Sequence, residues 1–357
     1  LAQSIPPLVF MGFQLMFAII TPALITGASA DRLKFGAFVA FVAIWLVLVY
    51  APIAHWVFSP EGWLFAKGAE DFAGGTVVHA NAGAAGLALA IVLGKRLGWK
   101  KDPMRPHNLP FTLLGAGLLW FGWFGFNAGS ALGANGLAGL AFVNTNTATC
   151  AAMLGWLIVE KLRDGHPTTL GAASGAVAGL VAITPAAGFV SPVGAIFLGL
   201  IAGALCALAI GLKYRLGYDD ALDVVGVHLV GGVAGALLIG FFGSAQANGG
   251  IAGVDGLFYG GGGHLLWVQA QAVGAAVGYS FVATLVIAKV IDLVIGLRLT
   301  PDEERVGMDT VLHAETAYDF TGVGAGGFSP SHHRPAPPGP SIDVAGSTLA
   351  RTEGAQA

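Results

Sequence analysis

Two stretches decide the fold: TVVHANAG at residues 76–83 and VGVHLVGG at residues 225–232. Each places one histidine, His79 or His228, inside a long and nearly uncharged run. Each histidine also follows an aspartate, Asp71 or Asp220, by eight residues. An ionisable group at bilayer depth is costly and usually marks a pathway or a site. The matched pair therefore predicts a duplicated unit with its polar centre at the middle of a membrane.

The composition excludes an ordinary soluble protein. Of the 357 residues, 55% are hydrophobic and 10% are charged, whereas soluble domains have about 25% charged residues. The net charge of −3 says little about partners, and we expect no nucleic-acid partner for a membrane protein of this kind. Cys150 and Cys206 lie inside apolar runs, so we expect them to be packing residues. We therefore expect no disulfide, no metal site, no cofactor and no catalytic residue, and we predict that the chain is not an enzyme.

Apolar runs of the length that a bilayer requires, about 20 residues, predict nine transmembrane helices. They cover residues 6–30, 36–58, 73–94, 110–131, 137–159, 168–189, 192–213, 223–243 and 266–297. The chain begins with Leu1 and no basic-then-apolar signal segment precedes the first run, so we expect a start that is truncated or processed.

The basic residues alternate from loop to loop in step with this count. The intervening loops carry Lys67 alone, and the segment after the ninth span carries Arg298 and Arg305. By the positive-inside rule, we expect the spans to lie in the cell membrane, with the N-terminus outside the cell and the C-terminus in the cytoplasm. The loops after spans one, three, five and seven carry Arg32 and Lys34; Lys95, Arg96, Lys100, Lys101 and Arg105; Lys161 and Arg163; and Lys213 and Arg215.

The two histidines fall on spans of opposite direction, since span three runs inward and span eight runs outward. Similar motifs on oppositely directed helices indicate an inverted repeat around a midplane site. The predicted depths of the two imidazoles in a core about 30 Å thick differ by no more than about 10 Å. Spans four to eight form one block of five, and a matching first block would need two helices before Leu1. We therefore predict an all-α, polytopic, inverted-repeat bundle with nine spans present of an expected eleven.

The chain changes character after about residue 300. We predict a transmembrane domain at 1–300, a cytoplasmic regulatory segment at 301–323 and a disordered tail at 324–357. The tail is rich in Pro, Gly, Ser and His and cannot bury a core. The run PDEER at 301–305 could open a short helix, because proline and acidic residues suit a first helical turn.

The polar residues of the two repeats carry the functional hypothesis. Two neutral imidazoles can form a hydrogen-bonded pair and still present a polar edge to a passing ligand. Burial disfavours their charged form, so we expect both to be uncharged at neutral pH. Asp71 and Asp220 are interpreted as caps of the histidine-bearing helices, with an electrostatic contribution possible at the outer mouth.

Several longer motifs resemble the ammonium transporter (Amt/Mep/Rh) family, on its bacterial and plant Amt side. They are DFAGGTVVH, GWFGFNAGSA, AFVNTNTA, DDALDVVGVHLVGG and GMDTVLHAETAY, in the family's order over about residues 8–320. The resemblance implies eleven helices built as an inverted five-plus-five repeat with a last long helix. It also implies a homotrimer in the lipid bilayer, with one pore for ammonium or ammonia through each subunit.

The resemblance also implies roles for individual residues. His79 and His228 are the twin histidines of the pore, and Phe17 and Phe126 are stacked rings that close its outer mouth. Asp71 is structural and electrostatic. The vestibule residues for ammonium binding are Ser130, Phe58, Trp123 and Phe13; the apolar pore lining is Leu24, Leu119 and Val224; and the tail around Gly307, Asp309, His313 and Tyr318 contacts neighbouring subunits and a regulator of the PII type.

One position departs from the family pattern. Where the family has tryptophan in an IAHxxW motif, this chain has IAHWVF, with Phe58 at the expected position and Trp56 nearby. Phenylalanine is a weaker partner for a cation than tryptophan. We therefore expect weaker recruitment of ammonium.

The implied function is passage of ammonia through an apolar pore after ammonium has lost its proton, because the charged ion bears a heavy desolvation cost. Potassium has no proton to lose and stays outside. Three alternatives remain open: a Rh-like channel for neutral ammonia, a sensor that signals through residues 300–320, and a redox protein whose two histidines ligate haem. Membrane current, deletion of that tail and a Soret band would discriminate them.

Overall fold

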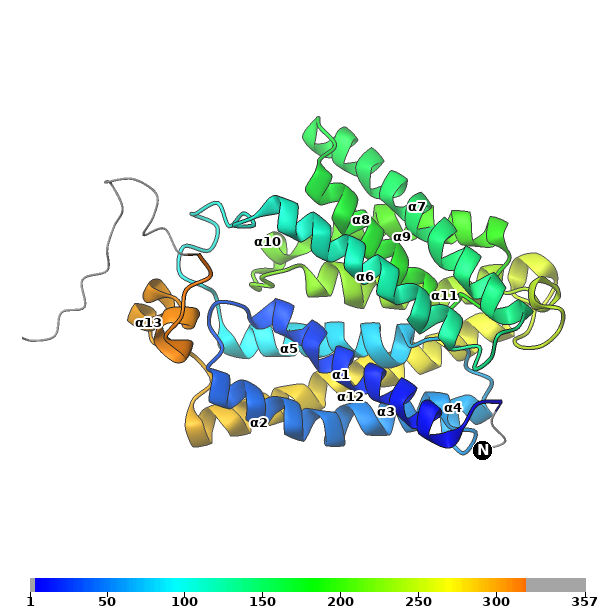
Figure 1. The fold of residues 1–357 in the computed structure, drawn as a ribbon, viewed down its shortest axis with the longest axis horizontal. Helices are drawn as coiled ribbons and strands as arrows, with labels where there is room; N and C mark the ends of the chain where they lie inside the picture. Colours follow the sequence, from blue (N-terminus) through cyan, green and yellow to red (C-terminus); the bar gives the residue numbers. More distant parts are fainter. Residues whose placement is uncertain (1–3, 319–357) are drawn as a thin grey trace, which may run out of the picture. The chain divides into compact units, whose positions relative to one another are not determined.

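The computed structural model describes residues 4–318, and its regular structure is helical (Figure 1). Eight of its helical segments are long and apolar enough to cross a membrane: Pro7–Ser29, Phe35–Ala66, Gly75–Leu93, Leu109–Gly129, Gly136–Asp164, Pro192–Leu216, Val225–Phe242 and His264–Ile295. The fold class predicted from the sequence, a polytopic helical membrane protein, is confirmed.

The helices follow one another along the chain with these bounds. They are α1 (Pro7–Ser29), α2 (Phe35–Trp45), η1 (Leu46–Tyr50), α3 (Ala51–Phe58), α4 (Trp63–Ala66), η2 (Gly75–Ala80), α5 (Asn81–Leu93), α6 (Leu109–Gly129), α7 (Gly136–Asp164), α8 (Thr169–Ile183), α9 (Pro192–Ala209), α10 (Leu212–Leu216), η3 (Val225–Leu229), α11 (Val230–Phe242), η4 (Ala245–Asn248), η5 (Leu257–Tyr259), α12 (His264–Ile295), α13 (Pro301–Val306) and η6 (Asp309–His313).

The span predicted at 168–189 is shorter than expected. Helix α8 has 15 residues and ends at Ile183, two residues before Pro185, which has no N–H to continue a helical ladder. Residues 184–190 form a turn instead, and Val190 bridges to Gly243. The turn is buried nonetheless. Helix α8 is apolar but shorter than the eight segments that are long enough to cross a membrane, so the span predicted at 168–189 is not among them.

The two histidine-bearing segments have the same construction. Each begins with a single π-helical stretch, η2 or η3, which contains the histidine, and continues as a helix of 13 residues, α5 or α11. Each is preceded by a left-handed residue three positions after the aspartate, Gly74 at φ 105° and Asp223 at φ 61°. A π-helical turn inside an α-helix is rare and frequently marks a functional site. The duplicated unit predicted from the sequence is therefore visible in the backbone.

Glycines let the two units cross at close range. A Cβ atom at Gly83 would lie 2.3 Å from the backbone nitrogen of Leu229, and one at Gly232 would lie 2.7 Å from the carbonyl oxygen of Gly75. Contacts this short exclude any side chain larger than hydrogen, so the two backbones touch directly. This crossing brings η2 against η3 and thus the two histidines together.

The buried apolar side chains divide between the two halves. One cluster joins α1, α2, α5 and α12, and another joins α7, α8, α9 and α11. In Figure 1 the first group lies below and α6–α9 lie above, with α1 and α6 next to each other. The conduit described below lies where these two groups meet.

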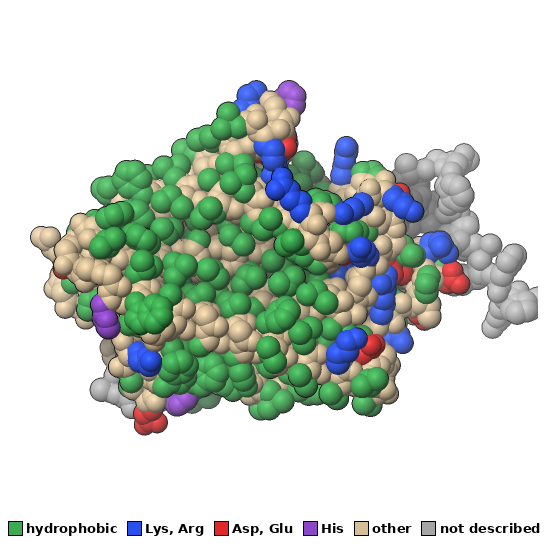
Figure 2. Space-filling model, turned by 180° about the vertical axis from the view of Figure 1, so that it is seen from behind, with side chains coloured by type: hydrophobic (Ala, Val, Ile, Leu, Met, Phe, Trp, Pro, Cys, Tyr) green, Lys and Arg blue, Asp and Glu red, His purple; other side chains and the backbone are tan. Residues whose placement is uncertain are grey.

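Basic side chains gather at one end of the bundle (Figure 2). Among them Arg32 is fully buried, and its guanidinium donates to the carbonyl oxygens of Ala28, Ala30, Gly94 and Asp219. It thereby joins the ends of α1 and α5 to the loop before η3. Burial lowers the pKa of Arg32 to about 10, so the group stays protonated at neutral pH.

The segment after α12 packs at the same end. Thr300 and Glu303 form a capping box that opens α13, which confirms the short helix expected from PDEER. Glu304 accepts from the backbone N–H of Leu97 and pairs with Arg298 at 2.7 Å. Residues up to Ala314 belong to the same compact unit as the membrane helices, and residues 319–357, which include the predicted tail at 324–357, lie outside the described residues.

Candidate ammonium-conducting site

The two imidazoles lie side by side at the centre of the bundle. The Nδ1 atoms of His79 and His228 are 3.2 Å apart, and the ring planes differ by 20°. Both side chains are buried, with 3% and 8% of their surface exposed. They come from η2 and η3, the matching stretches of the two repeats. The two rings are close together and buried, as the predicted pair requires.

A hydrogen bond between two Nδ1 atoms fixes complementary tautomers. One ring must carry hydrogen on Nδ1 and leave its Nε2 as an acceptor; the other must accept at Nδ1 and carry hydrogen on Nε2. The pair therefore offers one donor and one acceptor at its two Nε2 edges. Ammonia, which both donates and accepts, can use either edge.

Asp71 caps the unit formed by η2 and α5, as predicted. Its Oδ1 accepts from the N–H groups of Gly74 and Gly75, and its Oδ2 accepts from those of Thr76 and Val77, at 2.7–3.0 Å. These are donors that a helix start would otherwise leave unpaired. Burial raises the pKa of this carboxyl to about 6, and the four N–H donors oppose that rise.

Asp220 caps the unit formed by η3 and α11 less completely. Its Oδ2 accepts from the N–H of Val225 at 2.7 Å, and the residue is 1% exposed. Its Oδ1 is buried without a hydrogen-bond partner. Burial raises the pKa of this carboxyl to about 6; the N–H groups of Val225 and Val224 and the ammonium of Lys213 oppose the rise, and the carboxyl of Asp223 adds to it.

Four phenylalanines form one aromatic cluster on the Asp71 side of the histidines. Phe17 is at its centre, with ring centroids 5.0 Å from Phe13, 5.2 Å from Phe126 and 6.2 Å from Phe58. The expectation that Phe17 and Phe126 are stacked is wrong, because their planes meet at 83°, edge to face. This geometry points the positive edge of one ring at the negative face of the other.

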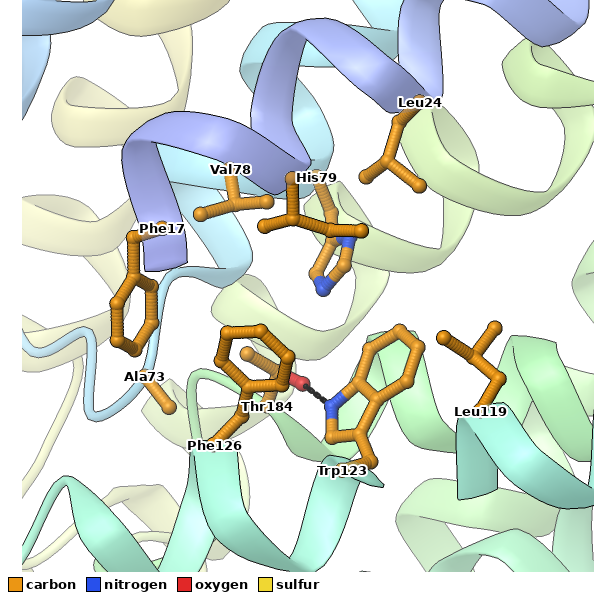
Figure 3. Close-up of a pocket in the computed structure, with 10 residues that line it drawn as sticks. Phe17, Leu24, Ala73, Val78, His79, Leu119, Trp123, Phe126 and Thr184 are labelled. Carbon is orange, nitrogen blue, oxygen red and sulfur yellow. Dashed lines mark hydrogen bonds between the residues drawn. The ribbon is translucent and has the colours of Figure 1, made fainter. Parts of the chain in front are cut away.

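Trp123 lies deeper than the vestibule position expected for it. Its ring lies 5.2 Å from the His79 ring, and its indole N–H donates to Thr184 at 2.8 Å. In Figure 3 it lies between Phe126 and Leu119 along α6. The reason is helical spacing: three residues before Phe126 is almost one turn further into the span. Trp123 therefore belongs to the wall of the conduit.

These groups enclose a small apolar cavity of about 20 Å³ (Figure 3). That is enough for about one water-sized molecule. Phe17 and Ala73 lie at one end of it, His79 and Trp123 in the middle, and Leu24 and Leu119 at the other end. Its walls are Phe17, Ile20, Leu24, Ala73, Val78, His79, Leu119, Trp123, Phe126 and Thr184.

Two expected site residues lie elsewhere. Val224 is not part of this cavity wall; it directly precedes η3 and packs against Ala28 and Ala90. Ser130 ends α6, and its hydroxyl donates to the carbonyl oxygen of Phe126 at 2.8 Å. That bond leaves the lone pairs of the hydroxyl oxygen as acceptors near the aromatic cluster.

A second cavity of about 520 Å³ lies at the C-terminal end of α5. Lys95, Tyr218 and Asp219 supply its polar wall, and apolar residues supply the rest: Leu87, Ala90, Ile91 and Leu216, with Gly94 and Gly217. Seen along α5, it is on the side of His79 opposite to the phenylalanine cluster. The two cavities share no lining residue.

The family model described as the Ammonium Transporter Family matches residues 2–318. The chain belongs to the ammonium transporter family. It is 57% identical to an ammonium transporter of Mycobacterium tuberculosis over 341 residues, covering 92% of this chain and 71% of that protein. It is 51% identical to one of Bacillus subtilis, covering 89% and 77%.

Solved structures agree with the fold. The crystal structure of Saccharomyces cerevisiae Mep2 matches with a TM-score of 0.79 at 38% identity, covering 84% of this chain and 68% of that one. A structure titled as a sensor Amt protein matches with a TM-score of 0.77 at 35% identity, covering 86% and 76%. Ammonium transport is the function that family membership gives this membrane protein, and its relatives are named as transporters.

Several residues of this ammonium transporter were missed in the sequence. Thr184 accepts the indole N–H of Trp123 and lines the cavity, yet a threonine in an apolar span carries no distinctive signal. Glu70 is buried beside Asp71, and its Oε1 accepts from Val254. The side-chain amide of Gln269 on α12 bonds twice to the backbone of Glu70: its oxygen accepts from the Glu70 N–H, and its NH₂ donates to the Glu70 carbonyl oxygen. These contacts join distant parts of the chain, which no local spacing reveals.

Phe58, which stands where the family pattern has tryptophan, and the nearby Trp56 make different contacts. Phe58 contacts Phe17, as the matching family position would require. Trp56 instead packs against Trp63 and Tyr279, with centroids 6.0 and 5.0 Å away. It therefore does not replace the missing tryptophan at the mouth.

Asp71→Ala is expected to destabilise the ammonium transporter by about 2 kcal/mol, the upper range for loss of a helix cap. Four buried N–H groups lose their acceptor, so the start of η2 becomes loose. Thermal unfolding in detergent measures the effect. Asp302→Ala on the exposed first turn of α13, whose pair with Arg305 lies in solvent, should change stability by less than about 1 kcal/mol. Equal melting temperatures for the two variants would contradict the assigned cap.

Proposed function

We propose that ammonium is recruited at the phenylalanine cluster, loses its proton there, and passes the histidine pair as neutral ammonia. The observation that carries this proposal is the 3.2 Å contact between the Nδ1 atoms of His79 and His228, with His79 in the wall of an apolar cavity of about 20 Å³. A bare cation in such a cavity has almost no polar partners to replace its water, whereas ammonia gives up far less on entering.

In this mechanism the phenylalanines and Ser130 act first. The ring faces attract a cation, and the Ser130 hydroxyl oxygen accepts a hydrogen from ammonium. Phe17 and Phe126 then separate the recruitment point from the cavity, so the ion must shed its charge to continue. Leu24, Leu119 and Trp123 form the apolar walls, and the wide cavity beside Lys95 is the inner vestibule.

The fate of the released proton divides two versions of this function. In a neutral version the proton stays outside, as in a Rh-like gas channel; in an electrogenic version it follows through the imidazoles. The edge-to-face contact of Phe17 and Phe126 and the hydrogen-bonded pair of His79 and His228 are compatible with both versions. Membrane current recorded together with uptake distinguishes them.

The decisive test is uptake into liposomes that contain the purified protein. Methylammonium should enter and be displaced by ammonium, while potassium should enter at the background rate of empty liposomes. Potassium uptake above that background would contradict selection by loss of a proton. A current that rises with ammonium would assign the electrogenic version.

We also propose an orientation in the membrane and an oligomeric state. We place the protein in the cell membrane with its basic end (Figure 2) and C-terminus in the cytoplasm, following the positive-inside rule. Assembly as a homotrimer would cover part of the apolar surface, such as Leu118 and Phe121 on α6, which are 63% and 78% exposed.

We assign residues 1–300 to transport, 301–323 to regulation by a PII-type protein and 324–357 to a tail. Gly307 ends α13 at φ 107°, and Asp309 begins η6. The ring of His313 packs 5.0 Å from that of Phe35. The carbonyl of Tyr318 accepts from the hydroxyl of Thr316.

A further inference from the structure

Glu70 is a buried carboxyl that the proposed conduit does not use. It directly precedes the capping Asp71, and 8% of its surface is exposed. Its Oε1 accepts from the backbone N–H of Val254 at 2.7 Å, whereas its Oε2 is buried without a hydrogen-bond partner. In such a setting the charged carboxylate is costly, and the neutral carboxyl is much less so.

One side of Glu70 is fixed to the packed helices. The side-chain amide of Gln269 on α12 accepts from the N–H of Glu70 at 2.8 Å and donates to its carbonyl oxygen at 2.7 Å. Gln269 is 1% exposed and also donates to the carbonyl oxygen of Ala236 on α11 at 3.0 Å. Glu70 therefore cannot move toward water without breaking these bonds. If its carboxyl becomes charged, the structure has to yield on the other side, where Val254 lies.

Val254 belongs to the loop of residues 244–256, which follows α11 and precedes α12. The side chain of Val254 is 54% exposed, and that of Ile251 is 63% exposed. Segments with exposed side chains and few buried contacts open at a lower free energy than the packed core. Three glycines of the loop have left-handed backbone conformations: Gly249 at φ 72°, Gly250 at φ 76° and Gly253 at φ 78°.

The loop approaches the carboxyl of Glu70 as closely as a backbone can. A Cβ atom at Gly253 would lie 2.7 Å from the ring of Phe189 and 3.1 Å from the Oε1 of Glu70. Only glycine therefore allows this approach. The closed loop thus shields Glu70 with backbone and an aromatic ring, neither of which stabilises a negative charge on Oε2.

Within residues 4–318, Glu70 forms no ion pair that would neutralise it. Lys67, the nearest basic residue in the sequence, donates instead to Gln271 at 3.1 Å. The carboxyl of Asp255 accepts from the N–H of Ala245 at 2.9 Å. Burial raises the pKa of Glu70 to about 7, and the N–H of Val254 opposes the rise. The titratable side chains on the segments around Glu70 and Asp71 are Tyr50, Lys67, Asp71 and Asp255.

The loop also contacts the turn that forms part of the narrow cavity. In the turn of residues 184–190, the carbonyl oxygen of Gly188 accepts from the side chain of Asn248 in the loop at 2.8 Å. In the same turn, the carbonyl oxygen of Thr184 accepts from the N–H of Ala73 at 3.1 Å. Thr184 and Ala73 both line the cavity. Movement of the loop therefore acts on a segment that shapes the conduit.

We propose that Glu70 is a pH-sensitive latch for the loop of residues 244–256: the neutral carboxyl keeps the loop closed, and its ionisation favours an open loop in which water solvates both oxygens. The proton exchanges with water while the loop is open, so the closed site needs no path for water. In the orientation proposed above the loop is on the outer side, and the latch then responds to external pH. The latch itself does not depend on how ammonia crosses the membrane.

The experiment measures hydrogen–deuterium exchange of the full-length protein in detergent between about pH 5 and pH 8. Exchange of the loop amides, corrected for the intrinsic rate at each pH, gives the equilibrium between open and closed loop. The wild type is compared with Glu70→Gln, since glutamine keeps an oxygen for the N–H of Val254 but cannot ionise. Glu61→Gln is the matched control, because Glu61 is an exposed carboxyl.

The sign of the effect follows from the raised pKa. The carboxyl has a pKa of about 7 in the closed loop and near its ordinary value of 4.5 in the open loop. Closure is therefore most favoured at low pH and loses up to about tenfold per pH unit until it levels off above about pH 7. We expect the open fraction of the wild type and of Glu61→Gln to rise at least about tenfold from pH 5 to pH 7. The open fraction of Glu70→Gln should stay constant.

An open fraction of the wild type that does not change with pH would overturn the latch. The same pH response in Glu70→Gln would overturn it equally, because another group would then be responsible. If the glutamine variant does not fold, Glu70→Leu gives the same comparison, since leucine cannot ionise and suits the apolar surroundings of Phe189. Exchange is measured without transport, so the result is independent of the proposed function.

Discussion

His79→Ala and His228→Ala are each expected to reduce selective ammonium uptake by at least about 100-fold, equivalent to about 2.7 kcal/mol of barrier. Either change removes half of the hydrogen-bonded pair and leaves the other ring with an unpaired Nδ1. Ammonia then loses a polar partner in the middle of an apolar cavity. The space left by the imidazole also admits water, so potassium leakage should increase. Methylammonium uptake and potassium flux in liposomes measure the two effects.

The matched control is His55→Ala, because His55 is an exposed histidine of α3. It should transport as the wild type does. Both pore variants should elute as the wild-type oligomer, since the rings lie inside one bundle. If both variants fold and take up methylammonium at the wild-type rate, the assignment of the pore histidines is refuted.

Gly232→Val should have the largest effect on the fold. The new Cβ would lie 2.7 Å from the carbonyl oxygen of Gly75, 2.8 Å from the nitrogen of Ala80 and 3.1 Å from the Cβ of His79. Two of these neighbours are backbone atoms of a packed segment and cannot move alone. Overpacking of this kind costs about 1–3 kcal/mol or more. The expected outcome is a lower melting temperature and loss of uptake, because the two histidines are pushed apart.

Gly274→Ala provides the comparison, since a Cβ at that position of α12 has nothing within 4 Å. Alanine within a helix is favoured over glycine by about 0.5–1 kcal/mol, so this variant should melt slightly higher and transport normally. A Gly232→Val protein with wild-type stability would show that the two repeats are not in direct backbone contact.

Much of the architecture could be predicted because membrane physics leaves a strong signal in sequence. Long apolar runs, alternating basic loops and the paired TVVHANAG and VGVHLVGG motifs predicted the spans and the repeat. The one span that differs, α8, stops early at Thr184-Pro185. A window of apolar composition cannot register a break caused by the backbone of one proline.

The site could be predicted only in outline. Pairing of His79 and His228 follows from symmetry, but the depth of Trp123, the edge-to-face contact of Phe17 and Phe126 and the role of Thr184 depend on helix rotation. The π-helical turns η2 and η3 add to that difficulty, because they rotate each histidine relative to an ideal α-helix. The contrast between Asp71 and Asp220 likewise could not be predicted, since both occupy the same motif position.

The bond between the two imidazoles cannot obey the twofold relation of the repeats that supply them, because a single hydrogen belongs to one ring at a time. One Nε2 of the pair must therefore carry a hydrogen and the other a lone pair. Exchanging these identities requires one Nε2 to release a proton while the opposite Nε2 captures one. Each such reversal amounts to the net displacement of a single elementary charge across the barrier. In the electrogenic version of the proposed function, a second displacement in the same sense would have to wait until a ring flips.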